Sequence, residues 1–176
     1  MKFRIVTSFF LLFPFFGFSQ GEFNNWYFGT NAGVSFNTGI PVPFLTSAMN
    51  GTNAGGSNIS DSLGNILFYT NGFYVYNRNN VQMPTGMSPV NTCTGNFYKL
   101  CIAFQKLENF SKYWVFTAGC GDPINLSGLH YSIVDMTLDG GLGNVSNLEN
   151  GITVPGTEDA FAAVDATRQH NNRDVW

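Results

Sequence analysis

Short runs of apolar and aromatic residues, separated by polar turns, predict that this chain is built from antiparallel β-strands. The clearest set spans residues 58–77, where three such runs are separated by Ser-Asp-Ser-Leu-Gly-Asn and by Asn71-Gly72. Asn-Gly between two strand-like runs predicts a type I′ hairpin turn, because both central residues of that turn need positive φ. Gly64 is expected in the left-handed position of a bulged loop. Residues 58–77 therefore predict a three-stranded meander.

Similar runs flank this meander on both sides. The run 129–135 alternates, which places its odd-numbered residues on one face of a strand and its even-numbered residues on the other. Segments 37–57 and 77–96 are rich in proline, glycine and polar residues and predict irregular connections. No amphipathic helical pattern occurs after residue 20. The further predicted strands are 26–28, 34–36, 101–104, 113–117 and 129–135.

The strand pattern repeats along the chain. Ile59, a loop and NILFYT correspond to Ile102, a loop and KYWVFT, and both correspond to Ala163-Val164-Asp165, a loop and RDVW. Equivalent positions are 47 residues apart between Leu67 and Trp114, and 62 residues apart between Trp114 and Trp176. A period near fifty with about four strands per unit predicts blades of a β-propeller. A β-sandwich is the competing interpretation.

The number of predicted blades is smaller than a closed ring requires. Propellers close with about four to eight blades, whereas residues 20–176 supply about two and a half four-stranded units. Trp176 also falls inside a predicted strand. We therefore expect residues 20–176 to be an incomplete propeller domain, truncated at its C-terminus and continued in a longer protein.

The first residues have the pattern of a secretory signal peptide. Lys2 and Arg4 precede an apolar run over residues 5–16, and Gly17-Phe18-Ser19 supplies small residues two positions apart. The run is interrupted by Pro14 and is shorter than the ~20 apolar residues of a membrane span. We expect residues 1–19 to be removed by the export machinery, and the mature chain to be secreted or held at the outer cell surface without a transmembrane span.

Charge and composition exclude one class of partner. Without Lys2 and Arg4, the formal net charge falls from −3 to −5, with six basic residues against eleven acidic ones. Nucleic-acid binding calls for clustered Lys and Arg, so no nucleic-acid partner is expected. Charged residues make up only 11% of the chain, and amides and hydroxyls supply the polar surface instead.

Three cysteines, Cys93, Cys101 and Cys120, occur in a chain expected to be exported, where disulfides form. They permit one bridge in three ways and leave an odd thiol. A zinc site is disfavoured, because no C-x-x-C pair is present and His130 is the only nearby histidine. One disulfide or buried thiols are the preferred interpretations, and the pairing stays open.

Candidates for catalysis are few, and we predict no catalytic residue. His130 or His170 beside Asp159 or Asp165 could transfer protons, but a histidine in a strand and one in a polar turn are more ordinary interpretations. No nucleophile elbow is present, and no helix follows Gly140-Gly141-Leu142-Gly143 to form a phosphate site. Four aspartates are candidate calcium ligands, but they lack the EF-hand alternation and are expected to cap turns; we predict no metal or cofactor. These are Asp61, Asp122, Asp135 and Asp139.

Aromatic residues are dense, at 16% of the chain. Exposed rings could stack on the apolar faces of sugars, whereas rings between blades fill the space between sheets. We predict the second role for Phe68, Trp114 and Phe116. Tyr74 and Tyr76 are the candidate ligand-binding residues.

The ordered combination of three segments resembles a known family. These are NNWYFGTNAGVSFN, ISDSLGNILFYTNGFYVYNRNNVQMPTG and LHYSIVDMTLDGGLGNV. They look like the N-terminal propeller region of large secreted Bacteroidetes proteins that carry a gliding-motility-associated C-terminal sorting domain, which is read by the type IX secretion system. The likeness covers nearly all of residues 20–176; the three cysteines and the loop 119–127 depart from it. It implies export, surface attachment and adhesion, although the sorting domain itself is absent from the sequence.

These observations lead to one expected function and one alternative. We expect a non-catalytic binding or scaffold module of an exported, adhesin-like surface protein, with a surface glycan or a protein as partner. The alternative is a secreted glycan-active hydrolase on a propeller scaffold. That alternative needs two carboxyl groups about 5–10 Å apart across one pocket, for which Asp61, Asp122, Asp135 and Glu158 are the candidates.

Overall fold

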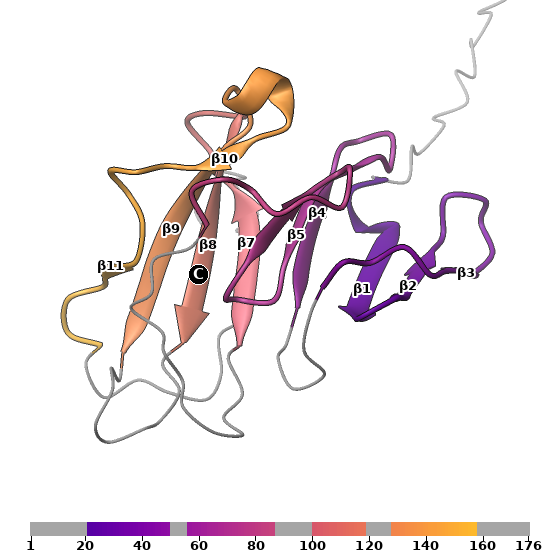
Figure 1. Ribbon diagram of the computed structural model, residues 1–176, viewed down its shortest axis with the longest axis horizontal. Helices are drawn as coiled ribbons and strands as arrows, with labels where there is room; N and C mark the ends of the chain where they lie inside the picture. The colour runs from indigo at the N-terminus through magenta and orange to yellow at the C-terminus, as the bar shows by residue number, and fades with distance from the viewer. Residues whose placement is uncertain (1–20, 50–55, 87–99, 119–127, 158–176) are drawn as a thin grey trace, which may run out of the picture.

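The computed structural model describes residues 21–49, 56–86, 100–118 and 128–157, whose regular secondary structure is almost entirely β-strand. Within these ranges, the regular elements other than strands are two short 3₁₀ turns, η1 (Gly21–Phe23) and η2 (Asp139–Gly141). The strands form three antiparallel sheets that follow one another along the chain (Figure 1). The all-β prediction is confirmed, while the described residues do not form a closed ring of sheets.

The first sheet contains β1 (Asn25–Gly29), β2 (Ala32–Ser35) and β3 (Val42–Phe44), in that order. The first two strands were predicted, but the prediction that residues 37–57 are wholly irregular is wrong at β3. Pro43 is tolerated there because β3 pairs only with β2, so the missing N–H of proline faces away from the ladder.

The second sheet is the predicted meander, with β4 (Ser57–Ser60), β5 (Ile66–Thr70) and β6 (Val75–Asn77). The register shifts between Ile59 and Ser60, and Gly64 has φ of 83°. Both features match the bulged loop that the sequence predicts, because only glycine adopts this left-handed conformation without a steric penalty.

The turn at Asn71-Gly72 differs from the prediction. Thr70 pairs with Val75, so the loop has four residues rather than two, and only Gly72 takes positive φ. The Asn71 side chain accepts hydrogen bonds from the backbone N–H groups of Phe73 and Tyr74, at 3.0 and 2.8 Å. This side-chain turn replaces the type I′ geometry, because asparagine can hydrogen-bond to the backbone two residues ahead.

A short extended segment follows β6 and runs along its outer edge. Tyr76 forms an isolated antiparallel bridge with Gln82, and the Met83 N–H donates to the carbonyl of Val75 at 2.8 Å. This segment occupies the place of a fourth strand. The second sheet therefore approaches the four-stranded unit that the repeat predicts.

The third sheet is the largest and joins five strands. β9 lies next to β8, and its other edge pairs with β10 at one end and with β11 at the other. The bounds of β9 are those predicted from the alternating pattern of residues 129–135. The strands are β7 (Cys101–Gln105), β8 (Lys112–Ala118), β9 (Leu129–Asp135), β10 (Asn144–Val145) and β11 (Ile152–Thr153).

The second sheet is packed on both of its faces. Phe68 and Val75, on one face, are fully buried in a core shared with residues of the third sheet, and the Phe68 ring meets Tyr113 edge-on at 5.4 Å. Tyr69 and Tyr76, on the other face, form a second core with Tyr27 of the first sheet. The three sheets are thus stacked face to face, and burial of a side chain such as Phe68 stabilises the stack by about 1.5–3 kcal/mol.

The first strands of the three sheets are neighbours. β4 lies between β1 and β7 (Figure 1). The Asn58 amide donates to the carbonyl of Asn25 at 2.6 Å, and the Ser57 hydroxyl accepts the Ala103 N–H at 2.9 Å. Strand edges carry backbone groups with no partner in their own sheet, so these polar side chains satisfy them.

The outer face of the third sheet carries an aromatic row, which consists of Phe104, Trp114, Phe116 and Tyr131. Strand alternation places these rings opposite the core residues Ala103, Val115 and Val134, and all four rings are half-buried. Phe68 lies between two sheets as predicted, whereas Trp114 and Phe116 lie on this outer face. The predicted signal peptide, the strand set at 160–165 and Trp176 lie outside the described residues.

Candidate functional site

The two tyrosines predicted to bind a ligand differ in exposure. Tyr74, in the loop between β5 and β6, is 44% exposed. Tyr76, in β6, is 7% exposed, and its ring stacks on Tyr69 with the centroids 5.2 Å apart. The two rings lie 6.4 Å apart. Only Tyr74 presents an accessible ring surface.

The histidine and acid candidates do not gather at one place within the described residues. His130 is buried in β9, where its Nδ1 lies 3.2 Å from the Thr153 hydroxyl of β11. Its surroundings are those of a core histidine at a strand pair. His170, Asp159, Asp165 and Glu158 lie outside the described part of the chain.

Asp61 and Asp135 each close a turn of their own. Asp61 accepts the backbone N–H groups of Leu63 and Asn65 and the Asn65 amide, at 2.8–3.0 Å. Desolvation acts to raise the pKa of Asp61, but these hydrogen bonds outweigh it and hold the pKa below its usual value. Both the turn geometry and the ionised state follow from the same contacts.

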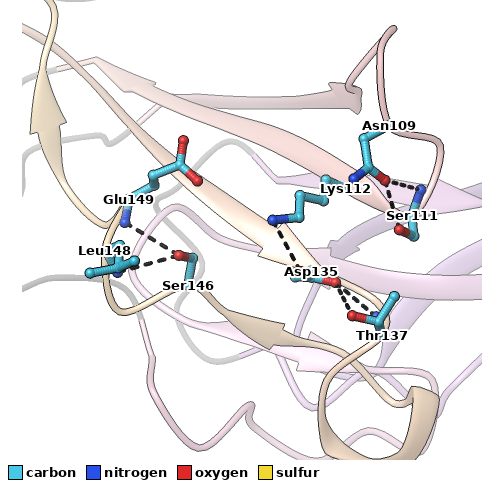
Figure 2. A network of polar contacts seen from close by, with 8 residues as sticks. All are labelled: Asn109, Ser111, Lys112, Asp135, Thr137, Ser146, Leu148 and Glu149. Carbon is cyan, nitrogen blue, oxygen red and sulfur yellow. Dashed lines mark hydrogen bonds and ion pairs between the residues drawn. The ribbon is translucent and has the colours of Figure 1, made fainter.

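Asp135 is the centre of a small polar network (Figure 2). It accepts the backbone N–H and the hydroxyl of Thr137 at 2.9 and 2.6 Å, and Lys112 lies 3.3 Å away. Burial acts to raise the pKa of Asp135, but the Thr137 hydrogen bonds and the Lys112 ammonium outweigh it and lower the pKa. Asp135 thus ends β9 and ties it to β8, as expected for a turn-capping aspartate.

The metal and disulfide candidates are only partly described. Cys101 is half-buried in β7, with its Sγ 3.8 Å from the Thr70 carbonyl, while Cys93, Cys120 and Asp122 lie outside the described residues. In the ranges that the structure describes, no three His, Cys, Asp or Glu residues come together as a metal site. The disulfide pairing stays a prediction.

An open cleft of about 420 Å³, with polar and apolar lining, lies between the first and second sheets. Its volume is within the range of small-ligand sites, ~300–1,000 Å³. Its lining combines amides, two aromatic rings and one arginine, from segments that are far apart in the sequence. The lining residues are Asn25, Tyr27, Asn37, Phe44, Thr46, Gly64, Asn65, Ile66, Arg78 and Asn79.

The Gly64 carbonyl organises one side of the cleft. It accepts the Asn25 amide at 2.7 Å and the Asn37 amide at 2.9 Å. The Asn25 amide also donates to the Ser60 hydroxyl at 2.9 Å. A Cβ at position 64 would lie 2.1 Å from the Asn37 side chain. Glycine is therefore required here for both its φ and its lack of a side chain.

Aromatic rings form the apolar part of the cleft. Tyr27 and Phe44 lie 4.8 Å apart and are tilted by 60°, and Tyr27 stacks on Tyr69 at 4.2 Å. Desolvation, followed by repulsion from Tyr69, raises the pKa of Tyr27 to about 12. The Tyr27 hydroxyl therefore stays neutral at physiological pH and can both donate and accept hydrogen bonds.

Arg78 and Asn79 come from the turn that follows β6. The Asn77 side chain shapes this turn by accepting the N–H groups of Asn79 and Val81, at 2.9 and 3.2 Å. The Arg78 guanidinium donates to the Gly141 carbonyl in η2. This contact links the arginine to the β9–β10 connection of the third sheet.

The sequence does not predict the cleft: the two candidate ligand-binding residues, Tyr74 and Tyr76, belong to the same meander but are not among its lining residues. Amides in turns are common, and nothing in a single sequence indicates that residues 37, 65 and 79 converge. The one available signal was the density of asparagine beside aromatic residues around residues 24–28 and 71–80.

Among the described helices, none has the length and apolar character needed to cross a bilayer. Comparison of the chain with family models, with curated proteins and with solved structures finds no match.

Proposed function

We propose that this chain is a non-catalytic binding module of an exported, adhesin-like surface protein, with its three sheets as successive blades of a β-propeller. One observation carries the binding role: the cleft between the first and second sheets is lined by amides, aromatic rings and one arginine. Its described lining contains no carboxylate, histidine or thiol. Such a lining can hold a ligand but offers no carboxyl, imidazole or thiol group for acid–base or nucleophilic catalysis.

The arrangement of the sheets supports the propeller part of the proposal. Propeller blades are antiparallel meanders packed around a central channel. Here three consecutive meanders stack face to face, and the first strand of each lies beside the first strand of the next. The aromatic row on the third sheet would then pack against a further blade, as the second sheet does on both of its faces.

Export and surface attachment rest on the sequence. The leader pattern of residues 1–19 predicts secretion, and the resemblance to Bacteroidetes proteins with type IX sorting domains implies display at the cell surface. Adhesion through a glycan or a protein agrees with an open cleft that is polar and aromatic.

The experiment measures binding and turnover on the same purified chain. A glycan array reports binding, and reducing-end and peptide-release assays report hydrolysis. Saturable binding without turnover is the expected result. Hydrolysis of any of these probes by the purified chain, at a rate that scales with the protein concentration, would overturn the proposal.

One observation favours a glycan hydrolase as the second candidate. Asp61 binds the amide of Asn65, and Asn65 lines the cleft, so one carboxylate lies a single residue away from it. Hydrolysis needs a second carboxyl about 5–10 Å away. Turnover that is abolished in Asp61→Asn but kept in Asp135→Asn would establish this candidate, and its absence would remove it.

A further inference from the structure

We infer that the cleft between the first and second sheets binds an acidic glycan, with Arg78 on a sugar carboxylate and the asparagine amides on the sugar hydroxyls. This inference rests on the proposed binding function and names the ligand class of its site. It follows from the charge of the lining, from the way Arg78 is held and from the position of the amides beside two aromatic rings.

The charge of the lining favours an anionic ligand. Arg78 is the one ionised side chain among the described lining residues, and the Tyr27 hydroxyl remains protonated at physiological pH. A single positive charge in a lining that has no carboxylate of its own favours a ligand with isolated negative charges. A divalent cation is disfavoured because carboxylates, its preferred ligands, are missing from this lining.

Arg78 is held in a manner suited to recognising a carboxylate. It follows Asn77, whose side chain fixes the turn, and its Nη2 donates to the Gly141 carbonyl. A guanidinium carries five N–H donors in a planar fork, so one such contact leaves donors for a ligand. A guanidinium fork binds a carboxylate with two parallel hydrogen bonds, which a lysine ammonium cannot reproduce.

The amides are placed to bind hydroxyl groups. Asn37 donates to the Gly64 carbonyl at 2.9 Å and Asn65 donates to Asp61 at 3.0 Å, and both residues are exposed. After one such donation, each amide still has a second N–H and an acceptor oxygen. Sugar hydroxyls both donate and accept, so they match this mixed set.

Two aromatic rings complete the match with a sugar. Tyr27 and Phe44 are half-buried cleft residues that meet at an angle of 60°. Ring faces of this kind pack against the apolar C–H faces of a pyranose. A nucleic acid would supply similar rings and anionic groups, but it would call for many cations, and the chain has a net negative charge.

Isothermal titration with two matched probes tests the inference. The probes are a tetramer of galacturonic acid and the neutral galactose tetramer, and the protein is the purified chain. We expect the uronate to bind at least about tenfold more tightly than the neutral tetramer, and this preference to shrink at high salt. Equal affinity for the two probes, or no binding of the uronate, would overturn the inference.

Variants assign the preference to Arg78. Arg78→Gln should reduce uronate affinity about tenfold and leave that of the neutral probe within twofold, while Arg78→Lys should lose less. Lys106→Gln is the matched control, because it removes the same charge from above Trp114 on the third sheet. A loss in Lys106→Gln equal to that in Arg78→Gln would contradict the inference. Urea unfolding of each variant identifies losses of affinity that are caused by misfolding. If Arg78→Gln is misfolded, Asn79→Ala provides the second test, because it should also weaken binding of the uronate.

Failure of the inference can be distinguished from failure of the proposed function. If neither tetramer binds but another glycan or a protein does so without turnover, the acidic-glycan inference fails and the binding function stands. If the uronate tetramer is cleaved, the proposed non-catalytic function fails. The effect of Arg78→Gln on uronate affinity still tests the acidic-glycan inference in that case.

Discussion

Removal of the Asn25 amide tests how the first two sheets are joined. Asn25 is 7% exposed in β1, and its amide donates to the Ser60 hydroxyl at 2.9 Å and to the Gly64 carbonyl at 2.7 Å. A net hydrogen bond contributes about 0.5–1.5 kcal/mol, and a buried group left without a partner costs about 1–3 kcal/mol. In the variant, the Gly64 carbonyl still accepts the Asn37 amide. The cost of a buried group without a partner therefore applies mainly to the Ser60 hydroxyl. Asn25→Ala should therefore lower the free energy of unfolding by about 1.5–4.5 kcal/mol.

The assay is urea unfolding followed by intrinsic fluorescence, with the slope compared between variants to check that the unfolding transition is unchanged. Asn109→Ala is the control, because the Asn109 side chain accepts two hydrogen bonds from Ser111 in an exposed turn, and it should cost less than about 1 kcal/mol. Ser60→Ala combined with Asn25→Ala should cost less than the sum of the single variants. An Asn25→Ala variant no less stable than Asn109→Ala would refute the reasoning.

Three further predictions follow from the same structure. Asp135 has a lowered pKa in the folded state. Its contribution to stability is therefore present above the unfolded pKa of about 3.9 and is lost as the pH falls through the folded pKa. Between pH 7 and pH 3, the urea midpoint should consequently drop less in Asp135→Asn than in the parent. The pKa of Tyr27 is raised to about 12, so stability should decline between about pH 10 and 12. Ultraviolet titration of Tyr27→Phe should show a smaller late phase than the parent, because burial also raises the pKa of Tyr69 and of Tyr113. Gly64→Ala should destabilise the fold by more than about 1 kcal/mol in urea, because φ is 83° and the new Cβ meets Asn37; a change smaller than that of Gly39→Ala, where a Cβ meets nothing, would contradict this explanation.

Local patterns in the sequence predicted most strands, because alternation and β-branched residues determine them directly. The bounds of β9 came from the alternation of residues 129–135, and the bulge at Gly64 came from a glycine in a polar loop. β3 was missed because Pro43 suggests a loop, although a proline fits an edge strand. Asn71 was assigned to a two-residue turn because local chemistry does not indicate where strand pairing stops.

The candidate site could not be predicted in the same way. Tyr74 and Tyr76 are only two residues apart, but Tyr74 lies in the β5–β6 loop, whereas Tyr76 lies in β6 on the face that packs against the first sheet, so one ring is exposed and the other buried. The cleft arises where turns of two sheets converge on Gly64 and Arg78. These turns converge only because the two sheets stack on one another. The sequence repeat predicts that similar sheets follow one another, but it does not predict which of their turns meet.

The stacking of successive meanders through their first strands is the central claim, and nuclear Overhauser spectroscopy of the isotope-labelled chain tests it most directly. The account predicts cross-peaks between the Ala103 amide proton and the Ser57 side chain, and between the rings of Phe68 and Tyr113, which join the second sheet to the third. Cross-peaks within the β7–β8 pair without either of these contacts would contradict it.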